Sequence, residues 1–144
     1  AIGGILMFYK GVDFLEQDED GNIQISKERQ EKMERELEEY ENAEQYALRT
    51  TRSGYFPCFS CKNASQIYLH RGEVWRYGVT KKGERGRYPK GMPFEGLTYE
   101  VQLLGNIHQC LVEEKRKIYQ YAVLPENLKR DIPIIRPPGN KRDD

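Results

Sequence analysis

The stretch that decides the predicted fold is residues 66–80, which read QIYLHRGEVWRYGVT. Two runs in it, 66–69 and 74–80, are rich in β-branched and aromatic residues, which favour strands. Between them lies the short segment 70–73, and its Gly72 suits a tight turn. The sequence therefore predicts an antiparallel β-hairpin over this stretch.

The register of this hairpin decides which side chains lie together. With the common two-residue turn, Tyr68 pairs with Trp75, and Tyr68 and Tyr77 then share one face of the sheet. A turn one residue longer would place Arg76 on that face instead. We expect the two-residue turn, and therefore a pair of tyrosines on one face.

The segments that follow predict one more strand and two helices. Residues 98–104 are typical of a strand, and the basic, Gly-containing segment 81–87 is expected to be a loop running into a short helix. Residues 106–121 repeat apolar side chains at helical spacing, and Glu114 falls on the same side. The Pro-rich tail, 132–144, is expected to be extended across the surface.

Upstream of the hairpin, the pattern predicts a separate acidic extension. Residues 12–26 suit a hairpin, and residues 26–48 suit a helix that begins with Ser26 as its N-cap. The apolar stripe of this helix consists of Met33, Leu37, Tyr40, Ala43 and Ala47. A polar joint follows, so we expect an extension over 1–49 and a main domain over 50–144.

Charge divides the chain in the same way. Residues 1–49 carry six Lys and Arg against thirteen Asp and Glu, whereas the net charge of all 144 residues is zero. The basic remainder suggests a partner that carries phosphate groups, although two halves that attract each other or two solvated faces would also produce this pattern. The longest apolar run, 2–9, is too short to cross a membrane.

The cysteines are too few for a disulfide framework. Cys58 and Cys61 form one C-x-x-C, a weak zinc signal, because a closed structural zinc site takes four ligands. Cys110, His70 and His108 are the candidates to complete such a site. Zinc at Cys58 and Cys61 is therefore an open but unfavoured alternative.

Several enzyme classes lack their signatures in this chain. The sequence has no P-loop, no G-x-G-x-x-G, no H-E-x-x-H and no G-x-S-x-G. With two histidines, a His-centred nuclease or a Ser-His-Asp hydrolase has little material.

The order of the remaining motifs resembles the GIY-YIG nuclease superfamily. The resemblance consists of Ile-Tyr at 67–68, Tyr-Gly at 77–78, Thr80, Arg87 at the family's spacing, and Glu114 on a later helix. It implies an α/β (α+β) fold in which a small antiparallel sheet is flanked by helices, here with an N-terminal helical extension.

The resemblance extends to one branch of that superfamily. Residues 55–61, 67–70, 75–78 and 136–141 are similar to C-terminal toxin domains of bacterial polymorphic toxins. This similarity implies an endonuclease that cleaves DNA as part of a secreted effector in the target-cell cytoplasm, with a cognate immunity protein as partner.

Some motif positions have rival candidates. Aligning on the glycine places Arg76 rather than Tyr77 in the second tyrosine position. Glu113 is a rival for the helix glutamate, and Asn127 or Asn140 is the candidate for the asparagine with which many family members end.

The motif residues suit hydrolysis of a phosphodiester bond, whose transition state gains negative charge. Tyr68 would take the proton of the attacking water, Tyr77 would orient the water or the phosphate, and Arg87 would bind the phosphate oxygens. Glu114 would hold Mg²⁺ or another divalent cation. The residues expected to bind substrate and to lower the pKa of Tyr68 are Arg76, Lys81, Lys82 and Arg85.

Two other classes of function fit the same residues. One is a non-catalytic nucleic-acid-binding module, in which basic and aromatic side chains hold strands by charge and stacking. The other is a zinc-stabilised protein-interaction domain that uses the C-x-x-C. The motifs leave the choice between DNA and RNA open, and we expect DNA.

Overall fold

The computed structural model describes residues 7–144, which form two compact units, one ending at Glu39 and one from Tyr40 to Asp144. Helices occur together with small antiparallel sheets, which confirms the predicted α+β class. Within this described range, no helix combines the length and the apolar character that a membrane crossing requires. Most of the apolar run at 2–9 lies outside the described residues.

The first unit contains the hairpin predicted over residues 12–26. Its elements, in chain order, are β1 (Met7–Phe8), the 3₁₀ turn η1 (Tyr9–Gly11), β2 (Leu15–Gln17) and β3 (Ile23–Ile25). All three strands pair antiparallel, in the order β1-β2-β3. The Asp18 carboxylate accepts hydrogen bonds from the backbone N–H groups of Asp20 and Asn22, at 2.9 and 2.8 Å, and so closes the turn.

The helix α1 (Lys27–Glu41) begins as predicted but ends early. The Ser26 hydroxyl accepts a hydrogen bond from the N–H of Arg29, as expected of an N-cap. The prediction of a helix as far as Leu48 is wrong, because a strand, β4 (Ala43–Thr50), follows directly.

Strand β4 is the centre of the second unit. It lies in a three-stranded antiparallel sheet of order β7-β4-β8, and six of its eight residues are buried. The spacing of Tyr40, Ala43 and Ala47 suits a helix, but pairing with a strand on each side overrides that local preference. The boundary between the units therefore lies before Tyr40, not after residue 49 as the sequence suggested.

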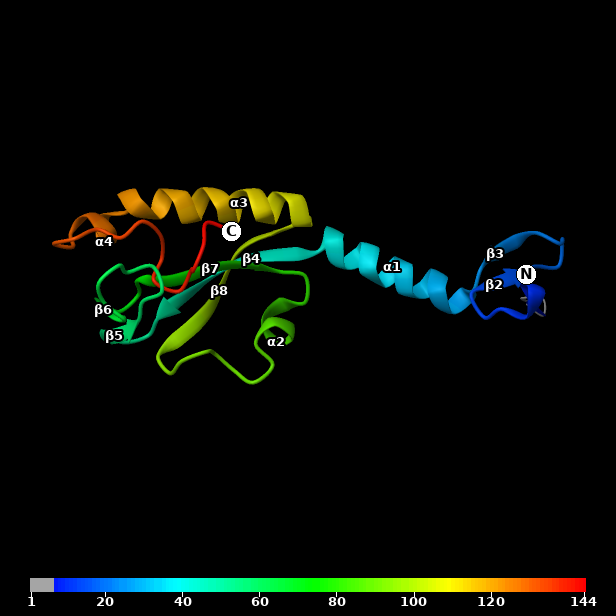
Figure 1. Ribbon diagram of the computed structural model, residues 1–144, viewed down its shortest axis with the longest axis horizontal. Coiled ribbons are helices and arrows are strands. Elements are labelled where there is room, and N and C mark those ends of the chain that lie inside the picture. The colour runs from blue at the N-terminus through cyan, green and yellow to red at the C-terminus, as the bar shows by residue number, and fades with distance from the viewer. Residues whose placement is uncertain (1–6) are drawn as a thin grey trace. The chain divides into compact units, whose positions relative to one another are not determined.

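The neighbours of β4 are β7 (Val74–Thr80) and β8 (Leu97–Gly105), both strands that the sequence predicted. The helix α3 (Ile107–Gln120) covers one face of this sheet, and a ribbon formed by β5 (Gly54–Pro57) and β6 (Gln66–Leu69) lies on the other side (Figure 1). The core facing α3 contains Ala47, Val74, Tyr77, Ile118 and Tyr121. The core on the ribbon side contains Tyr46, Leu48, Phe56, Leu69, Trp75 and Leu97.

The predicted hairpin between 66–69 and 74–80 is wrong. Both runs are strands, but β6 pairs with β5 and β7 pairs with β4. The last residue of β4, Thr50, forms backbone hydrogen bonds with the turn between the two runs. The N–H of Thr50 donates to Glu73 O at 3.0 Å, and the N–H of Gly72 donates to Thr50 O at 2.9 Å. The turn therefore leads from one sheet into another instead of closing a two-stranded ladder.

Among the remaining elements, the short helix α2 (Gly83–Arg87), before β8, lies in the segment where it was predicted. The two elements after α3, η2 (Tyr121–Val123) and α4 (Pro125–Leu128), were not predicted from the sequence. Asn106 and Gln109 form a reciprocal capping box at the start of α3. The tail was expected to lie extended across the surface, but residues 137–140 are buried, and the N–H of Gly139 donates to Trp75 O.

Candidate active site

The four predicted catalytic residues do not meet as the hairpin register required. Tyr68 is on β6, on the exposed face of the β5–β6 ribbon, directly opposite Tyr55. Tyr77 is on β7 and packs on the side of the sheet that α3 covers. The prediction that these tyrosines share one sheet face is therefore wrong, because their strands belong to different sheets.

Tyr77 was predicted to orient the attacking water or the phosphate, and its side chain is instead buried in the core. It is buried against Ala47, Ile118 and Tyr121. Burial, with a further contribution from the carboxylate of Glu126, raises the pKa of Tyr77 to about 12. At neutral pH its hydroxyl is protonated, and the residue contributes to the core.

The tyrosine that accompanies the Tyr-Gly motif is one that the sequence analysis assigned to a helix. Tyr46 on β4 is directly opposite Gly78 on β7, and a Cβ at Gly78 would lie 2.3 Å from the Tyr46 hydroxyl oxygen. Because Gly78 has no side chain, the Tyr46 ring can pack directly over the backbone of β7 at this position. Because opposed residues share a face, Tyr46 and Arg76, which is opposite Leu48, lie on the same side.

Tyr46 is the buried member of a tyrosine cluster with Tyr88 and Tyr99. Its ring stacks on Tyr99 at 4.7 Å between centroids, and its hydroxyl is 2.8 Å from that of Tyr88. The Tyr99 hydroxyl donates to the Glu44 carboxylate at 2.5 Å. Burial first, then these hydrogen bonds, raise the pKa of Tyr88 and Tyr99. Tyr88 and Tyr99 therefore present protonated hydroxyls at neutral pH.

Arg76 lies beside this cluster. Its Nη1 donates to Gly139 O at 2.9 Å, and its buried Nε has no hydrogen-bond partner among the described residues. The positive charge of Arg76 opposes the burial effect that raises the pKa of the Tyr88 hydroxyl and of the Glu114 carboxyl. The guanidinium is therefore within electrostatic reach of each. Arg76 was expected to bind substrate, and the structure leaves it with unused donor capacity.

Glu114 is half-buried on α3, as its helical spacing predicted. Burial raises its pKa; Arg76 and Lys115 oppose this effect and Asp144 adds to it. Its rival, Glu113, instead lies 3.9 Å from the Lys117 ammonium group.

The chain offers few groups that could hold a metal. Among residues 7–144, no cluster of three or more His, Cys, Asp or Glu side chains is arranged around a common point. Mg²⁺ in proteins commonly uses one or two carboxylates together with substrate phosphates and water. Glu114 is a half-buried carboxylate, and the negative charge of Asp144 contributes to its raised pKa.

The basic residues predicted to bind phosphate belong to α2 and the segment before it. The Arg87 guanidinium carbon lies 4.6 Å from the centroid of the Tyr88 ring, which places Arg87 next to the tyrosine cluster. Lys81 lies over the Tyr40 ring at 4.5 Å. Lys82 and Arg85 are exposed. Arg87 is therefore the member of this group that the structure joins to the cluster.

The two candidate asparagines have structural partners. Asn140 is fully buried, and its amide both accepts from the N–H and donates to the carbonyl of Tyr77, each at 3.0 Å. Asn127 Nδ2 donates to the carbonyls of Ala122 and Ile134, and its Oδ1 accepts from the N–H of Ile134. Both side-chain amides are therefore used in hydrogen bonds to the backbone of neighbouring segments.

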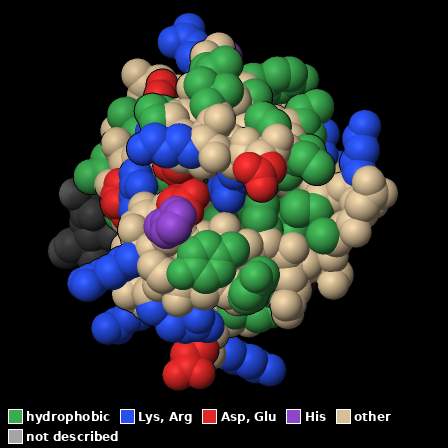
Figure 2. Space-filling model, turned by 90° about the vertical axis from the view of Figure 1, so that its left-hand side faces the viewer, with side chains coloured by type: hydrophobic (Ala, Val, Ile, Leu, Met, Phe, Trp, Pro, Cys, Tyr) green, Lys and Arg blue, Asp and Glu red, His purple; other side chains and the backbone are tan. Residues whose placement is uncertain are grey.

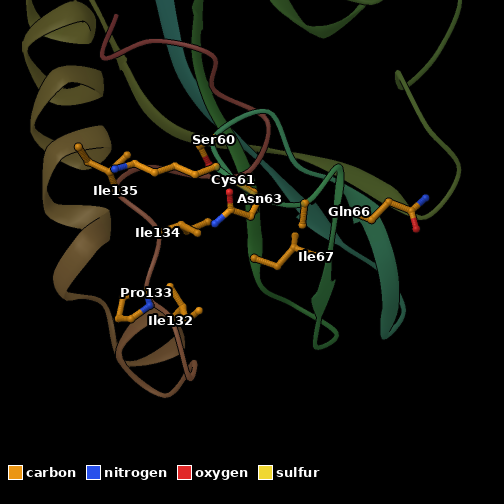
Figure 3. A pocket seen from close by; sticks show the side chains of 11 residues that line it. Ser60, Cys61, Asn63, Gln66, Ile67, Ile132, Pro133, Ile134 and Ile135 are labelled. Atoms are coloured by element: carbon orange, nitrogen blue, oxygen red, sulfur yellow. The ribbon is translucent and has the colours of Figure 1, made fainter.

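Cys58 and Cys61 are joined in a disulfide, and the third cysteine, Cys110, is buried and free. In the disulfide, neither sulfur is a thiolate that could bind zinc. Beside it is an apolar groove of about 590 Å³, lined by residues 60–67 except Ser65 and by the tail residues 132–135 (Figure 3). None of the residues predicted for catalysis or substrate binding lines this groove.

Comparison with known proteins finds no matching family model, no matching curated protein and no matching solved structure.

Proposed function

We propose that residues 40–144 form a nuclease that hydrolyses phosphodiester bonds of DNA with the help of a divalent cation such as Mg²⁺. The observation that carries this proposal is Arg76 itself, a cation with a buried, unpartnered Nε and a hydrogen bond to Gly139 O, whose charge opposes the rise in the pKa of the Glu114 carboxyl and of Tyr88. Together with Arg87, these groups combine positive charge, a hydroxyl donor and a carboxylate, which phosphodiester hydrolysis requires.

Each group has a role that follows from its surroundings. The guanidinium of Arg76 would bind the non-bridging oxygens of the scissile phosphate, where negative charge grows as water attacks phosphorus. The Tyr88 hydroxyl, positioned by its hydrogen bond with buried Tyr46, would donate to the same phosphate. Arg87 would bind a phosphate beside the Tyr88 ring.

Glu114 would hold the cation. Burial disfavours its negative charge in the free protein, and a bound divalent cation would compensate for that cost. A bound Mg²⁺ would stabilise charge on the leaving oxygen.

The resemblance to toxin domains supports a biological setting for this activity. We propose that the chain acts as a C-terminal toxin domain of a secreted antibacterial effector, in the cytoplasm of the target cell, and that a cognate immunity protein protects the producer. The Cys58–Cys61 disulfide is compatible with passage through an oxidising compartment.

Plasmid nicking with and without EDTA tests the nuclease proposal. We expect metal-dependent nicking that falls ~10²-fold or more in Arg76→Ala and Glu114→Gln, because each removes a charge from the reacting centre. Glu113→Gln is the matched control on the same helix and should stay within about threefold of the native rate. Circular dichroism of each variant separates lost activity from lost folding.

The outcomes distinguish the alternatives. Nicking that persists in both Arg76→Ala and Glu114→Gln would contradict the proposed centre. Binding of DNA without any cleavage by the native chain would favour the non-catalytic module, and stoichiometric zinc in the purified protein would favour the zinc-stabilised domain. Expression in the cytoplasm of a bacterial host should damage its DNA, and Glu114→Gln should relieve this effect.

A further inference from the structure

The exposed face of the β5–β6 ribbon carries three aromatic rings, which we call the aromatic patch: Tyr55, Tyr68 and His70. Tyr55 and Tyr68 are a cross-strand pair, with ring centroids 5.4 Å apart, and Tyr68 and His70 are 5.3 Å apart. The Tyr55 side chain is 66% exposed and that of Tyr68 is 44% exposed. Large ring surfaces therefore reach solvent on the side of the ribbon that faces away from the core.

We propose that the aromatic patch binds single-stranded DNA by stacking unpaired bases on Tyr55 and Tyr68. The inference rests on the proposed function, because the ligand is the substrate class of the proposed nuclease. It assigns Tyr68 to substrate binding on the ribbon, and not to the reacting centre.

Charge around the patch favours a polyanion over a protein as the occupant. Residues 50–72, which include the whole ribbon, contain Arg52, Lys62 and Arg71 and no Asp or Glu, and the carboxylate of Glu73, which follows, is paired with Arg130. All three side chains of the basic residues are exposed, and Arg71 follows His70 of the patch directly, whereas Arg52 lies over the ring of Phe56, a core residue of the ribbon. Figure 2 views this end of the molecule and shows hydrophobic side chains next to a histidine, with Lys and Arg side chains around them. Basic residues beside exposed rings are the combination that binds single strands, through phosphates and bases together.

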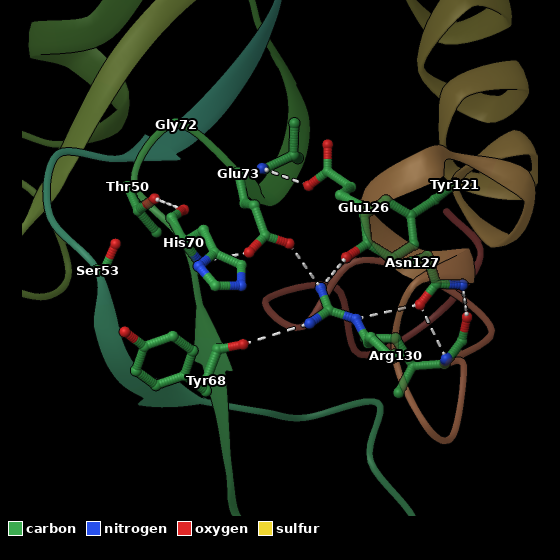
Figure 4. A network of polar contacts seen from close by, with 12 residues as sticks. Thr50, Ser53, Tyr68, His70, Gly72, Glu73, Tyr121, Glu126, Asn127 and Arg130 are labelled. Atoms are coloured by element: carbon green, nitrogen blue, oxygen red, sulfur yellow. Dashed lines mark hydrogen bonds and ion pairs between the residues drawn. The ribbon is translucent and has the colours of Figure 1, made fainter.

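A buried polar network holds the backbone of the patch in place (Figure 4). Arg130 donates to the carbonyl of Tyr68 at 3.3 Å and to the carboxylate of Glu73 at 3.0 Å. The same carboxylate accepts from the N–H of His70, and the Thr50 hydroxyl donates to His70 O. Arg130 and Glu73 are almost fully buried, with side chains 12% and 8% exposed, so this network constrains the strand firmly.

This constraint gives the patch the properties of a preformed binding surface. Rings that are fixed before the ligand arrives lose little conformational freedom on binding. A base in a duplex is already stacked on both faces, whereas an unpaired base is free to stack on a tyrosine. The patch should therefore discriminate between single and double strands.

Fluorescence anisotropy with the full chain tests the inference. The probes are fluorescein-labelled oligothymidylate and its duplex with oligodeoxyadenylate, both in EDTA so that no cleavage occurs. We expect Tyr55→Ala and Tyr68→Ala each to weaken binding of the single strand by about 5- to 100-fold. Binding of the duplex should change by less than about threefold. Tyr68→Phe should bind almost as well as the native chain, because it keeps the ring.

Matched controls separate stacking from other effects. Tyr119→Ala removes a tyrosine of similar exposure, 57%, from α3 and should leave binding unchanged. Arg71→Gln should reduce the slope of log affinity against log salt by about 0.7, the value for one phosphate contact on a single strand.

The inference is overturned if the native chain does not bind the single strand. It is also overturned if the Tyr55→Ala/Tyr68→Ala double variant binds the single strand within twofold of the native chain, a result that would favour a protein as the partner of the patch. A loss of duplex binding as large as the loss of single-strand binding would overturn it as well. Nicking assays report separately on the proposed function: a chain that binds single strands through the patch but never cleaves DNA supports this inference and contradicts the nuclease.

Discussion

Replacing Asn140 with alanine should destabilise the second unit strongly. β7 is an edge strand whose ladder partner is β4, so the other edge of the strand needs hydrogen-bond partners from elsewhere. The Asn140 amide supplies two of them, accepting from the N–H of Tyr77 and donating to its carbonyl, each at 3.0 Å. The side chain is 1% exposed, so water does not replace it easily.

The size of the effect follows from these two contacts. A buried backbone group that loses its partner costs about 1–3 kcal/mol. Loss of both contacts at Tyr77 should lower the free energy of unfolding by about 2–5 kcal/mol, a large part of the 5–15 kcal/mol typical of a domain. For a unit of this size, the midpoint of thermal unfolding should fall by roughly 10–25 °C.

Urea denaturation followed by tryptophan fluorescence measures this change. Trp75 is the single tryptophan of the chain and packs against Gly139, so its emission reports on the segment that carries Asn140. Asn63→Ala, at an exposed loop asparagine, is the matched control and should change stability by less than about 0.5 kcal/mol. If Asn140→Ala costs no more than Asn63→Ala, the account of the β7 edge is refuted.

Two further substitutions and one chemical titration should have distinct results. Gly78→Ala puts a methyl group against the Tyr46 ring and should cost about 1–3 kcal/mol in urea denaturation, whereas wild-type stability would contradict the contact. Burial raises the pKa of Glu114 above its ordinary 4.5, so its charged form is disfavoured in the fold. Glu114→Gln should therefore be more stable than native at pH 7, with a gain that disappears below about pH 4.5; a gain independent of pH would refute this reasoning. Thiol titration of denatured, unreduced protein should find one thiol, and three after reduction of Cys58–Cys61; three before reduction would exclude the disulfide.

Elements with complete local signals were predicted well. The N-cap Ser26 marks the start of α1 in the structure, and the runs at 66–69 and 74–80 are strands with the expected bounds. A cap satisfies the free N–H groups of a helix from residues nearby in the chain, so the signal is local and legible.

The candidate site was predicted less well because it depends on strand pairing. Arg76, Arg87 and Glu114 were named from motif spacing; in the structure Arg87 lies against the Tyr88 ring, and the charge of Arg76 opposes the rise in the pKa of Glu114. Tyr46 was missed, since Ala43 to Thr50 reads as helix and contains no turn or strand signal strong enough to oppose that interpretation.

The sequence by itself determined where α1, α3, β6, β7 and β8 begin to within a residue, which residues carry charge, and that a basic, tyrosine-rich unit follows an acidic one. Tertiary structure alone decided that β7 pairs with β4 and β6 with β5, and so which tyrosine lies beside Gly78. The physical reason is that alternation along a strand specifies its two faces but not its partner. The partner is selected by the burial of both faces of β4 and by backbone hydrogen bonds between residues far apart in the chain.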